Sequence, residues 1–163
     1  MPWQAIRARP VALAASLGAF SGVLAKIARD VTLLAQQEVA EVKEGGGSSR
    51  GGSSAMAHKR NPVGAVSVLA CTKRTPGLVA TALAAMEAEH ERPAGAWQSE
   101  WGTYTDLISL TGSATAWSRE LLENLVVDPE RMSANLAAAA TGDQSVDDGA
   151  GQLVDRALEA HRA

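Results

Sequence analysis

Large apolar side chains recur every three or four residues between positions 13 and 34 of this 163-residue chain. Spaced 4-3-4-3-4-3, they are Leu13, Leu17, Phe20, Leu24, Ile27, Val31 and Leu34. This heptad-like seam predicts one long helix, from about Pro10 to Val42, that needs other helices to cover it.

Further helices are predicted downstream. Asn61-Pro62 is a favourable helix start, because asparagine caps a helix well and proline fits its first turn. That helix is expected to run to about Glu91 with a kink at Pro76. A third is predicted over Trp97–Leu125, and two short ones over 129–140 and 147–161. The apolar stripe of the third comprises Leu107, Leu110, Ala114, Trp117 and Leu121.

No segment alternates apolar and polar residues as a strand would. The predicted fold is therefore all-α, a bundle of long helices. Residues 1–140 are expected to form one helical-bundle domain, and residues 141–163 a linker with a short C-terminal helix. Because the long helices carry more apolar surface than they can bury among themselves, we expect the chain to self-associate into a dimer or tetramer.

The composition argues against several partners. A net charge of −3 disfavours nucleic-acid binding. The apolar run near the N-terminus is broken by Ser16, Ser21 and Lys26, so neither a membrane span nor a targeting segment is expected. The single cysteine, Cys71, fits a reducing, cytoplasmic compartment and is interpreted as a small core residue.

Metal binding is not expected either. The three histidines, His58, His90 and His161, are far apart and lack ligand spacing.

The segment GGGSSRGGSSAMAHKRNPVGA at residues 45–65 interrupts the helical pattern. Its glycines disfavour helix, and no Gly-Lys-Ser/Thr follows them as in a phosphate loop. A flexible linker would account for the glycines and serines, but not for Lys59 and Asn61 beside the predicted helix start. An ammonium, backbone N–H groups and a helix N-terminus together suit a carboxylate. Ser53 or Ser54 beside that carboxylate is a candidate base for abstracting an adjacent proton.

The stretch GGSSAMAHKRNPV resembles the signature loop GSS-x-MP-x-K-x-NP of the fumarase/aspartase superfamily. Its Gly-Gly-Ser-Ser and His-Lys-Arg-Asn-Pro elements are similar to the 3-carboxy-cis,cis-muconate cycloisomerase branch, with adenylosuccinate lyases as near neighbours. Other stretches that resemble this branch are PWQAIR at 2–7, AKIARDVTLLAQQEVAEV at 25–42 and EHERPAGAWQSEW at 89–101. The resemblance covers about residues 1–140 and implies the superfamily's central helical bundle, with signature loop 45–62.

By this resemblance Ser53 is the catalytic serine. Lys59 and Asn61 would bind a substrate carboxylate and stabilise an enediolate-like intermediate, and Arg60 would contact a further carboxylate. The backbone of Met56 would shape the site, and Ser54 would contact substrate. The implied reaction is the reversible lactonisation of a muconate tricarboxylate in the β-ketoadipate route of aromatic catabolism. It needs no metal or other cofactor.

The chain also departs from the family pattern. Ala57 stands where the loop usually has proline, which should make the closed loop entropically costlier by up to about 1 kcal/mol. The family's two N-terminal motif blocks, with their histidine and threonine or serine residues, have no counterpart here. We therefore interpret the chain as a truncated version, nearly inactive alone, whose missing portion a separate chain would have to supply. The open alternatives are an adenylosuccinate-lyase-like enzyme and a non-catalytic helical oligomerisation fragment.

Overall fold

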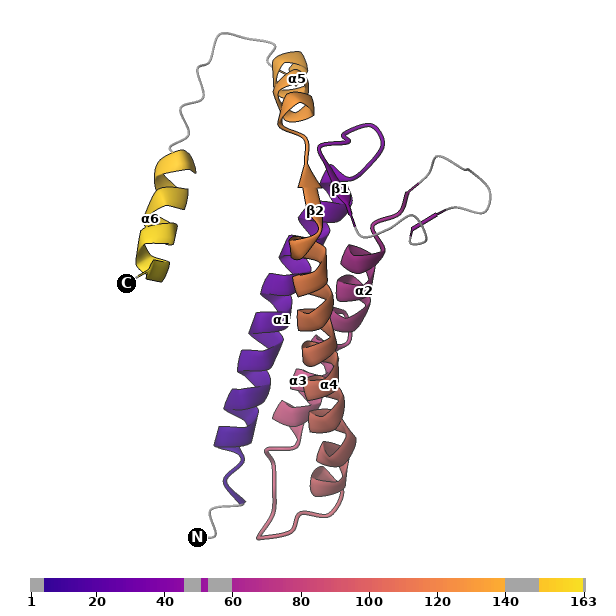
Figure 1. Cartoon of the computed structure of the whole chain (residues 1–163). Coiled ribbons are helices and arrows are strands. Elements are labelled where there is room, and N and C mark those ends of the chain that lie inside the picture. The colour runs from indigo at the N-terminus through magenta and orange to yellow at the C-terminus, as the bar shows by residue number, and fades with distance from the viewer. Residues whose placement is uncertain (1–4, 46–50, 53–59, 140–149, 163) are drawn as a thin grey trace. The chain divides into compact units, whose positions relative to one another are not determined.

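The computed structural model describes residues 5–45, 51–52, 60–139 and 150–162 (Figure 1). The chain divides into two compact units, residues 1–129 and residues 130–163. The first unit holds the long helices. The second contains most of α5 (Pro129–Ala139) and all of α6 (Ala150–Arg162), so the described residues confirm both predicted short helices.

Helix α1 spans Ala8–Leu34 and ends eight residues before the predicted Val42. The chain turns after Leu34, whose carbonyl accepts the N–H of Glu41 at 3.0 Å. Ala40 lies in this turn with a φ of 53°. The predicted C-terminal boundary was wrong because this turn carries the chain into a strand.

The buried side of α1 only partly matches the predicted seam. Leu24 and Val31 are buried, but Leu13 and Phe20 are 50% and 44% exposed. Smaller residues one position along the helix, Ala14, Ser21 and Ala28, are buried instead, because short side chains let the neighbouring helices approach closely. Val11, before the predicted seam, is buried too.

The predicted second helix is in fact two helices, α2 (Val63–Thr72) and α3 (Thr75–Ala84). Pro76 lies in the first turn of α3, where its missing N–H costs nothing, so it begins a helix rather than kinking one. The buried hydroxyl of Thr75 donates to the carbonyl of Thr72 at 2.9 Å and closes the junction. The expected extension to Glu91 was also wrong. Cys71 on α2 is only half-buried.

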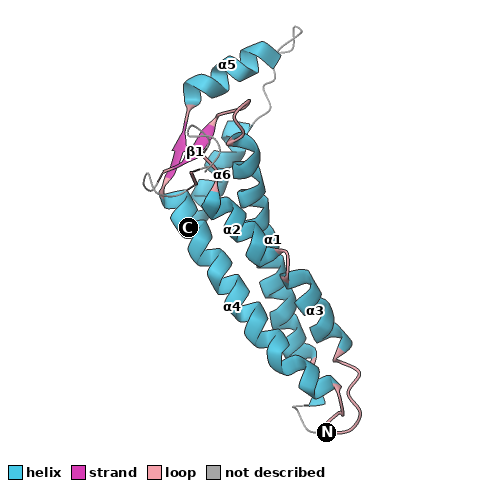
Figure 2. Cartoon of the chain, turned by 90° about the vertical axis from the view of Figure 1, so that its right-hand side faces the viewer, coloured by secondary structure: helices cyan, strands magenta, loops and turns pink. Residues whose placement is uncertain are grey.

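Helix α4 spans Ala96–Glu123, within two residues of the prediction, and packs against α1, α2 and α3 (Figures 1 and 2). Its predicted stripe faces the core: Leu107, Ala114 and Leu121 are buried, and Leu110 and Trp117 are half-buried. Leu107 joins Val11, Ala14 and Ala82 in one hydrophobic cluster. The all-α bundle is thus confirmed.

Two short strands were not predicted. β1 (Val42–Glu44) pairs antiparallel with β2 (Leu125–Val127), with Glu44 opposite Leu125. The N–H of Gly45 extends the pairing by donating to the carbonyl of Asn124 at 2.7 Å. Three residues are too few to show an alternating pattern, and these pair only because α1 and α4 end side by side (Figure 2).

Helix α1 is the one helix in the described ranges that is long and apolar enough to cross a bilayer. Core helices of soluble proteins share these properties, and here α1 packs against α2, α3 and α4. The expected absence of a membrane partner remains a prediction.

Candidate functional site

Of the predicted site residues, the structure describes Arg60 and Asn61. Ser53, Ser54, Met56 and Lys59 lie outside the described residues. The described residues define the base of the signature loop, where the chain leaves β1 and returns to α2.

Gly51 and Asn61 hold the two sides of the loop together. The backbone N–H of Asn61 donates to the carbonyl of Gly51 at 2.8 Å, and its side-chain amide donates to the same oxygen at 3.3 Å. Gly52 and Arg60 form an isolated antiparallel bridge beside them. Gly51 has a φ of +74°, and a Cβ there would lie 2.4 Å from the carbonyl oxygen of Asn61. Only glycine fits this position.

Asn61 therefore does not have the local role predicted for it. The residue preceding α2 is Pro62, and no side chain there caps the helix. Asn61 is exposed, and its side-chain amide donates to the carbonyl of Gly51 at the loop base. Its predicted contact with a substrate carboxylate stays a prediction.

The N-terminus of α2 already holds a carboxylate, that of Glu44 at the end of β1. One oxygen accepts the N–H of Gly64 at 2.9 Å, and the other accepts the N–H of Ala65 at 2.8 Å. These amides were expected to bind a substrate carboxylate, but in this structure the chain's own side chain occupies them. Local sequence gave no signal for this, because Glu44 lies 20 residues before Gly64.

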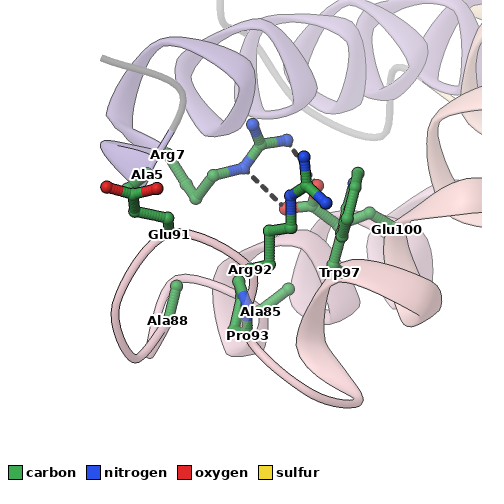
Figure 3. Close-up of a pocket in the computed structure, with 9 residues that line it drawn as sticks. All are labelled: Ala5, Arg7, Ala85, Ala88, Glu91, Arg92, Pro93, Trp97 and Glu100. Carbon is green, nitrogen blue, oxygen red and sulfur yellow. Dashed lines mark hydrogen bonds and ion pairs between the residues drawn. The ribbon is translucent and has the colours of Figure 1, made fainter. Parts of the chain in front are cut away.

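A pocket of about 270 Å³ lies where α1 and α4 begin (Figure 3). The guanidinium of Arg92 lies 5.9 Å from the ring centroid of Trp97, close enough for a cation–π contact. Trp97 in turn meets Trp101 edge-on, with the ring centroids 6.4 Å apart. The lining residues are Ala5, Arg7, Ala85, Ala88, Glu91, Arg92, Pro93, Trp97 and Glu100.

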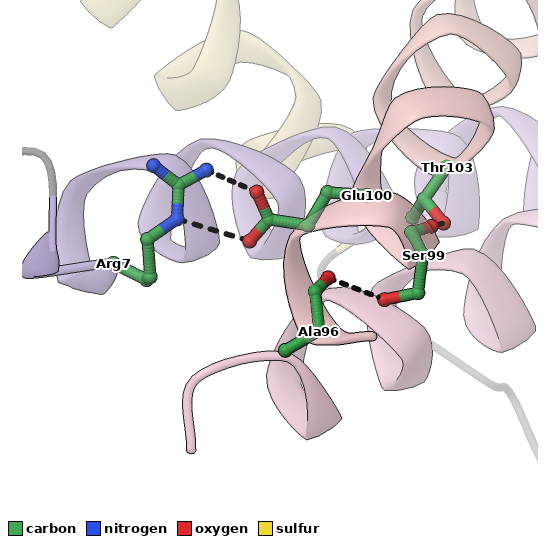
Figure 4. A network of polar contacts seen from close by, with 5 residues as sticks. All are labelled: Arg7, Ala96, Ser99, Glu100 and Thr103. Atoms are coloured by element: carbon green, nitrogen blue, oxygen red, sulfur yellow. Dashed lines mark hydrogen bonds and ion pairs between the residues drawn. The ribbon is translucent and has the colours of Figure 1, made fainter. Parts of the chain in front are cut away.

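Arg7 and Glu100 form an ion pair on the wall of this pocket (Figure 4). The Arg7 Nε donates to one Glu100 oxygen at 3.0 Å, and Nη2 donates to the other. Glu100 is held on the first turns of α4, where Ser99 and Thr103 bond back to backbone carbonyls at 2.7 Å. The pocket therefore presents balanced charges and an aromatic face.

Sequence reasoning missed these pocket residues as a group. The stretches at 2–7 and 89–101 were noted for their resemblance, but nothing in their spacing indicated that Arg7 and Glu100 meet. One signal was available. Glu100 lies on the apolar stripe of α4, seven residues before Leu107, and a glutamate at such a buried position requires a cationic partner.

The hydroxyl of Tyr104 is buried close to this pair and has no hydrogen-bond partner among the described residues. Burial raises the pKa of Tyr104 above its ordinary value, and the negative charge of Glu100 raises it further while Arg7 lowers it. The phenol is therefore held neutral and is unsuited to act as a base.

The pocket lies at the first turns of α4, whereas the loop follows β1, which pairs with the strand directly after α4 (Figure 1). A helix of 28 residues is about 40 Å long at about 1.5 Å per residue. Within one chain the two cannot contact the same small molecule. No cluster of three or more metal-ligating side chains occurs in the part of the chain that the structure describes.

Comparisons with known proteins find relatives of the segment that contains the loop and the long helices. A family model described as "Lyase" matches residues 5–77, which include the loop and its base. The 3-carboxy-cis,cis-muconate cycloisomerase of Pseudomonas aeruginosa is 49% identical over 135 residues, covering 83% of this chain and 29% of that protein. The nitrosuccinate lyase of Streptomyces davaonensis is 44% identical over 137 residues, with the same coverage.

Among solved structures, the 3-carboxy-cis,cis-muconate lactonizing enzyme of Pseudomonas putida superposes with a TM-score of 0.74 at 42% identity. The match covers 83% of this chain and 29% of that one. The chain thus spans about three tenths of the length of its curated relatives. The loop motif, the helical bundle and these matches agree: over most of its length the chain is similar to lyases of the fumarase/aspartase superfamily, and in particular to 3-carboxy-cis,cis-muconate cycloisomerases.

Proposed function

We propose that this chain carries the signature-loop part of a 3-carboxy-cis,cis-muconate cycloisomerase-type active site. The observation that supports this most strongly is the 49% identity to a curated cycloisomerase over 135 residues. A match of that length in a 163-residue chain must include residues 45–62. The small substrate would be a tricarboxylate.

In the ring-opening direction, the alkoxide of Ser53 takes the proton from the carbon next to a lactone carboxylate. The electron pair passes into that carboxylate as an enediolate, which Lys59 and Asn61 stabilise by charge and hydrogen bonding. Collapse of the enediolate forms the double bond, breaks the lactone C–O bond and releases a new carboxylate. No electrons are lost or gained, and the reverse sequence forms the lactone.

The remaining predicted residues hold the substrate. Arg60 binds a further carboxylate of the tricarboxylate, Ser54 contacts substrate, and the backbone of Met56 shapes the loop. Arg60 and Asn61 lie on the C-terminal side of the loop and form part of its base, which supports a role in the same site as Ser53.

The chain alone is expected to convert this substrate negligibly. A positioned acid or base contributes about 10²–10⁴-fold, and each fixed donor to developing charge about 10²–10³-fold. In the proposal, several of these groups come from other motif blocks and other subunits, in a cytoplasmic dimer or tetramer. The exposed Leu13, Phe20 and Val23 of α1 would lie in the subunit interface. Light scattering that shows a folded monomer at micromolar concentration would contradict this assembly.

The activity test is a chimaera in which residues 5–139 of this chain replace the matching segment of the Pseudomonas aeruginosa cycloisomerase. Spectrophotometry should show turnover of 3-carboxy-cis,cis-muconate that Ser53→Ala reduces by at least 100-fold. A correctly assembled chimaera without turnover would contradict the proposal. So would turnover that is indifferent to Ser53→Ala.

A further inference from the structure

Glu44 links the two sides of the signature loop through its side chain. It lies at the end of β1, just before the loop, and its carboxylate accepts the N–H groups of Gly64 and Ala65 just after it. Three N–H groups in the first turn of α2 have no partner within the helix, those of Val63, Gly64 and Ala65. Glu44 binds two of these three.

The backbone of Glu44 is itself fixed to the end of α4. Glu44 pairs with Leu125 in the β1–β2 ribbon, and the next residue, Gly45, donates to Asn124 at 2.7 Å. A Cβ on Gly45 would lie 2.7 Å from the same Asn124 oxygen, so a side chain there would push the strands apart. Glu44 thus extends to α2 from an anchored position.

The receiving end is equally constrained. Gly64 and Ala65 are buried, and a Cβ on Gly64 would lie 3.3 Å from both carboxylate oxygens of Glu44. Glycine at position 64 leaves room for the carboxylate to approach both amides. A negative group is also favoured there by the positive end of the helix.

We propose that Glu44 is the positioning residue of the signature loop. Its carboxylate occupies the anion position at the N-terminus of α2 and fixes the positions of Arg60 and Asn61 on the C-terminal side of the loop. Resting on the proposed function, it follows that a substrate carboxylate is bound by loop side chains and not by the amides of Gly64 and Ala65. Glu44 acts through the loop and does not touch substrate.

The test measures amide hydrogen exchange by NMR in the whole chain, in Glu44→Ala and in Glu44→Gln. Hydrogen bonds to charged groups contribute enough that exchange at Gly64 and Ala65 should accelerate by about tenfold or more in Glu44→Ala, and by less in Glu44→Gln. Exchange at Asn61, whose N–H closes the loop base, should accelerate several-fold. The matched control is Glu87→Ala, which removes an exposed carboxylate just after α3.

Three results would overturn the proposal. Unchanged exchange at Gly64 and Ala65 would show that the carboxylate does not hold them. Faster exchange at Gly64 and Ala65 with unchanged exchange at Asn61 would show that Glu44 caps α2 but does not position the loop. An equal acceleration at core amides such as those of Val68 and Leu107 would show a general loss of stability.

A rescue experiment with acetate distinguishes the carboxylate of Glu44 from the packing of its side chain. Glu44→Ala removes a CH₂–COO⁻ group, and acetate has that size and charge. Acetate at about 0.5 M should restore protection of Gly64 and Ala65 in Glu44→Ala, while sodium chloride at equal ionic strength should not. If acetate does not restore this protection, then packing of the Glu44 side chain, and not its carboxylate, protects Gly64 and Ala65 from exchange. Neither measurement requires turnover, so failure of the cycloisomerase assay would leave this result standing.

Discussion

Arg7 and Glu100 are 93 residues apart in the sequence and form a two-bond ion pair that links the start of α1 to the start of α4. The side chain of Glu100 is only 6% exposed and that of Arg7 is 24% exposed. Removing either partner should be costly, because a buried charge without a partner destabilises the folded state more than the intact pair stabilises it.

We expect Arg7→Met to lower the free energy of unfolding by about 3 kcal/mol, since it leaves the buried Glu100 charge unpaired. Glu100→Gln should cost less, because the Arg7 side chain is more exposed than that of Glu100 and can turn toward water. The double variant should be more stable than the sum of the single effects predicts. Urea denaturation followed by circular dichroism measures all three.

The exposed pair of Arg74 and Asp106 serves as the control, with side chains 61% and 50% exposed. Arg74→Met should cost about 0.5 kcal/mol or less. If Arg7→Met and Arg74→Met lower the free energy of unfolding equally, then burial of the Arg7–Glu100 pair does not increase its effect on stability.

Two glycines on α1 should respond in opposite directions to alanine. A Cβ on Gly18 would lie 2.8 Å from a methyl carbon of Val79 on α3, whereas nothing lies within 4 Å of one on Gly22. Gly22→Ala should raise the free energy of unfolding by about 1 kcal/mol through helix propensity alone. Gly18→Ala should lower it by about 1 kcal/mol, because forcing apart stiff packed groups outweighs that gain. Thermal unfolding that shows both variants stabilised would contradict the close approach of α1 and α3.

Tyr104 should ionise at higher pH than tyrosine in the unfolded chain. Burial, and then the charge of Glu100, raise its pKa above 10.0. Because the folded state favours the neutral phenol, this group's contribution to stability is present below about pH 10 and is lost as the pH rises further. Tyr104 is the only tyrosine, so absorbance near 295 nm follows it directly. Glu100→Gln should lower the midpoint, and a rise in that variant would contradict this assignment.

Gly51→Ala should open the base of the signature loop, because alanine disfavours a φ of +74° and its Cβ would collide with Asn61. Exchange of the Asn61 N–H should accelerate by about tenfold, since backbone strain of this kind costs on the order of 1–3 kcal/mol. Gly52→Ala is the matched control, since nothing lies within 4 Å of a Cβ there. Similar exchange in both variants would show that the Gly51 bond to Asn61 does not close the loop.

Local patterns in the sequence were sufficient to predict the helices. The α4 stripe of Leu107, Ala114 and Leu121 faces the core as predicted because its spacing persists for four turns. The α1 seam was placed partly on the wrong side, since a pattern of large residues overlooks Ala14 and Ala28, whose small size is what allows burial. Which side of α1 is buried is decided by its contacts with the neighbouring helices.

The break of the predicted second helix at Pro76 has a local cause, but the failures around the loop share another, contact between distant residues. The strand at Val42 exists only because Val127 is its neighbour, and the helix predicted to reach Val42 ends early as a result. The loop motif located Arg60 and Asn61 in the sequence. It could not show that Glu44 would occupy the helix N-terminus, because that contact depends on where β1 is anchored.

The double closure at the base of the loop has an evolutionary consequence. Gly52 and Arg60 are bridged, so extra residues inserted between these two positions would lengthen a segment whose ends are already joined, without loosening the bundle. Each doubling of such a loop costs only about 0.6 kcal/mol in closure entropy. Insertions between Gly52 and Arg60 can therefore be sampled at almost constant fold stability. Related chains can therefore differ widely in this segment while the helices on either side of it stay unchanged.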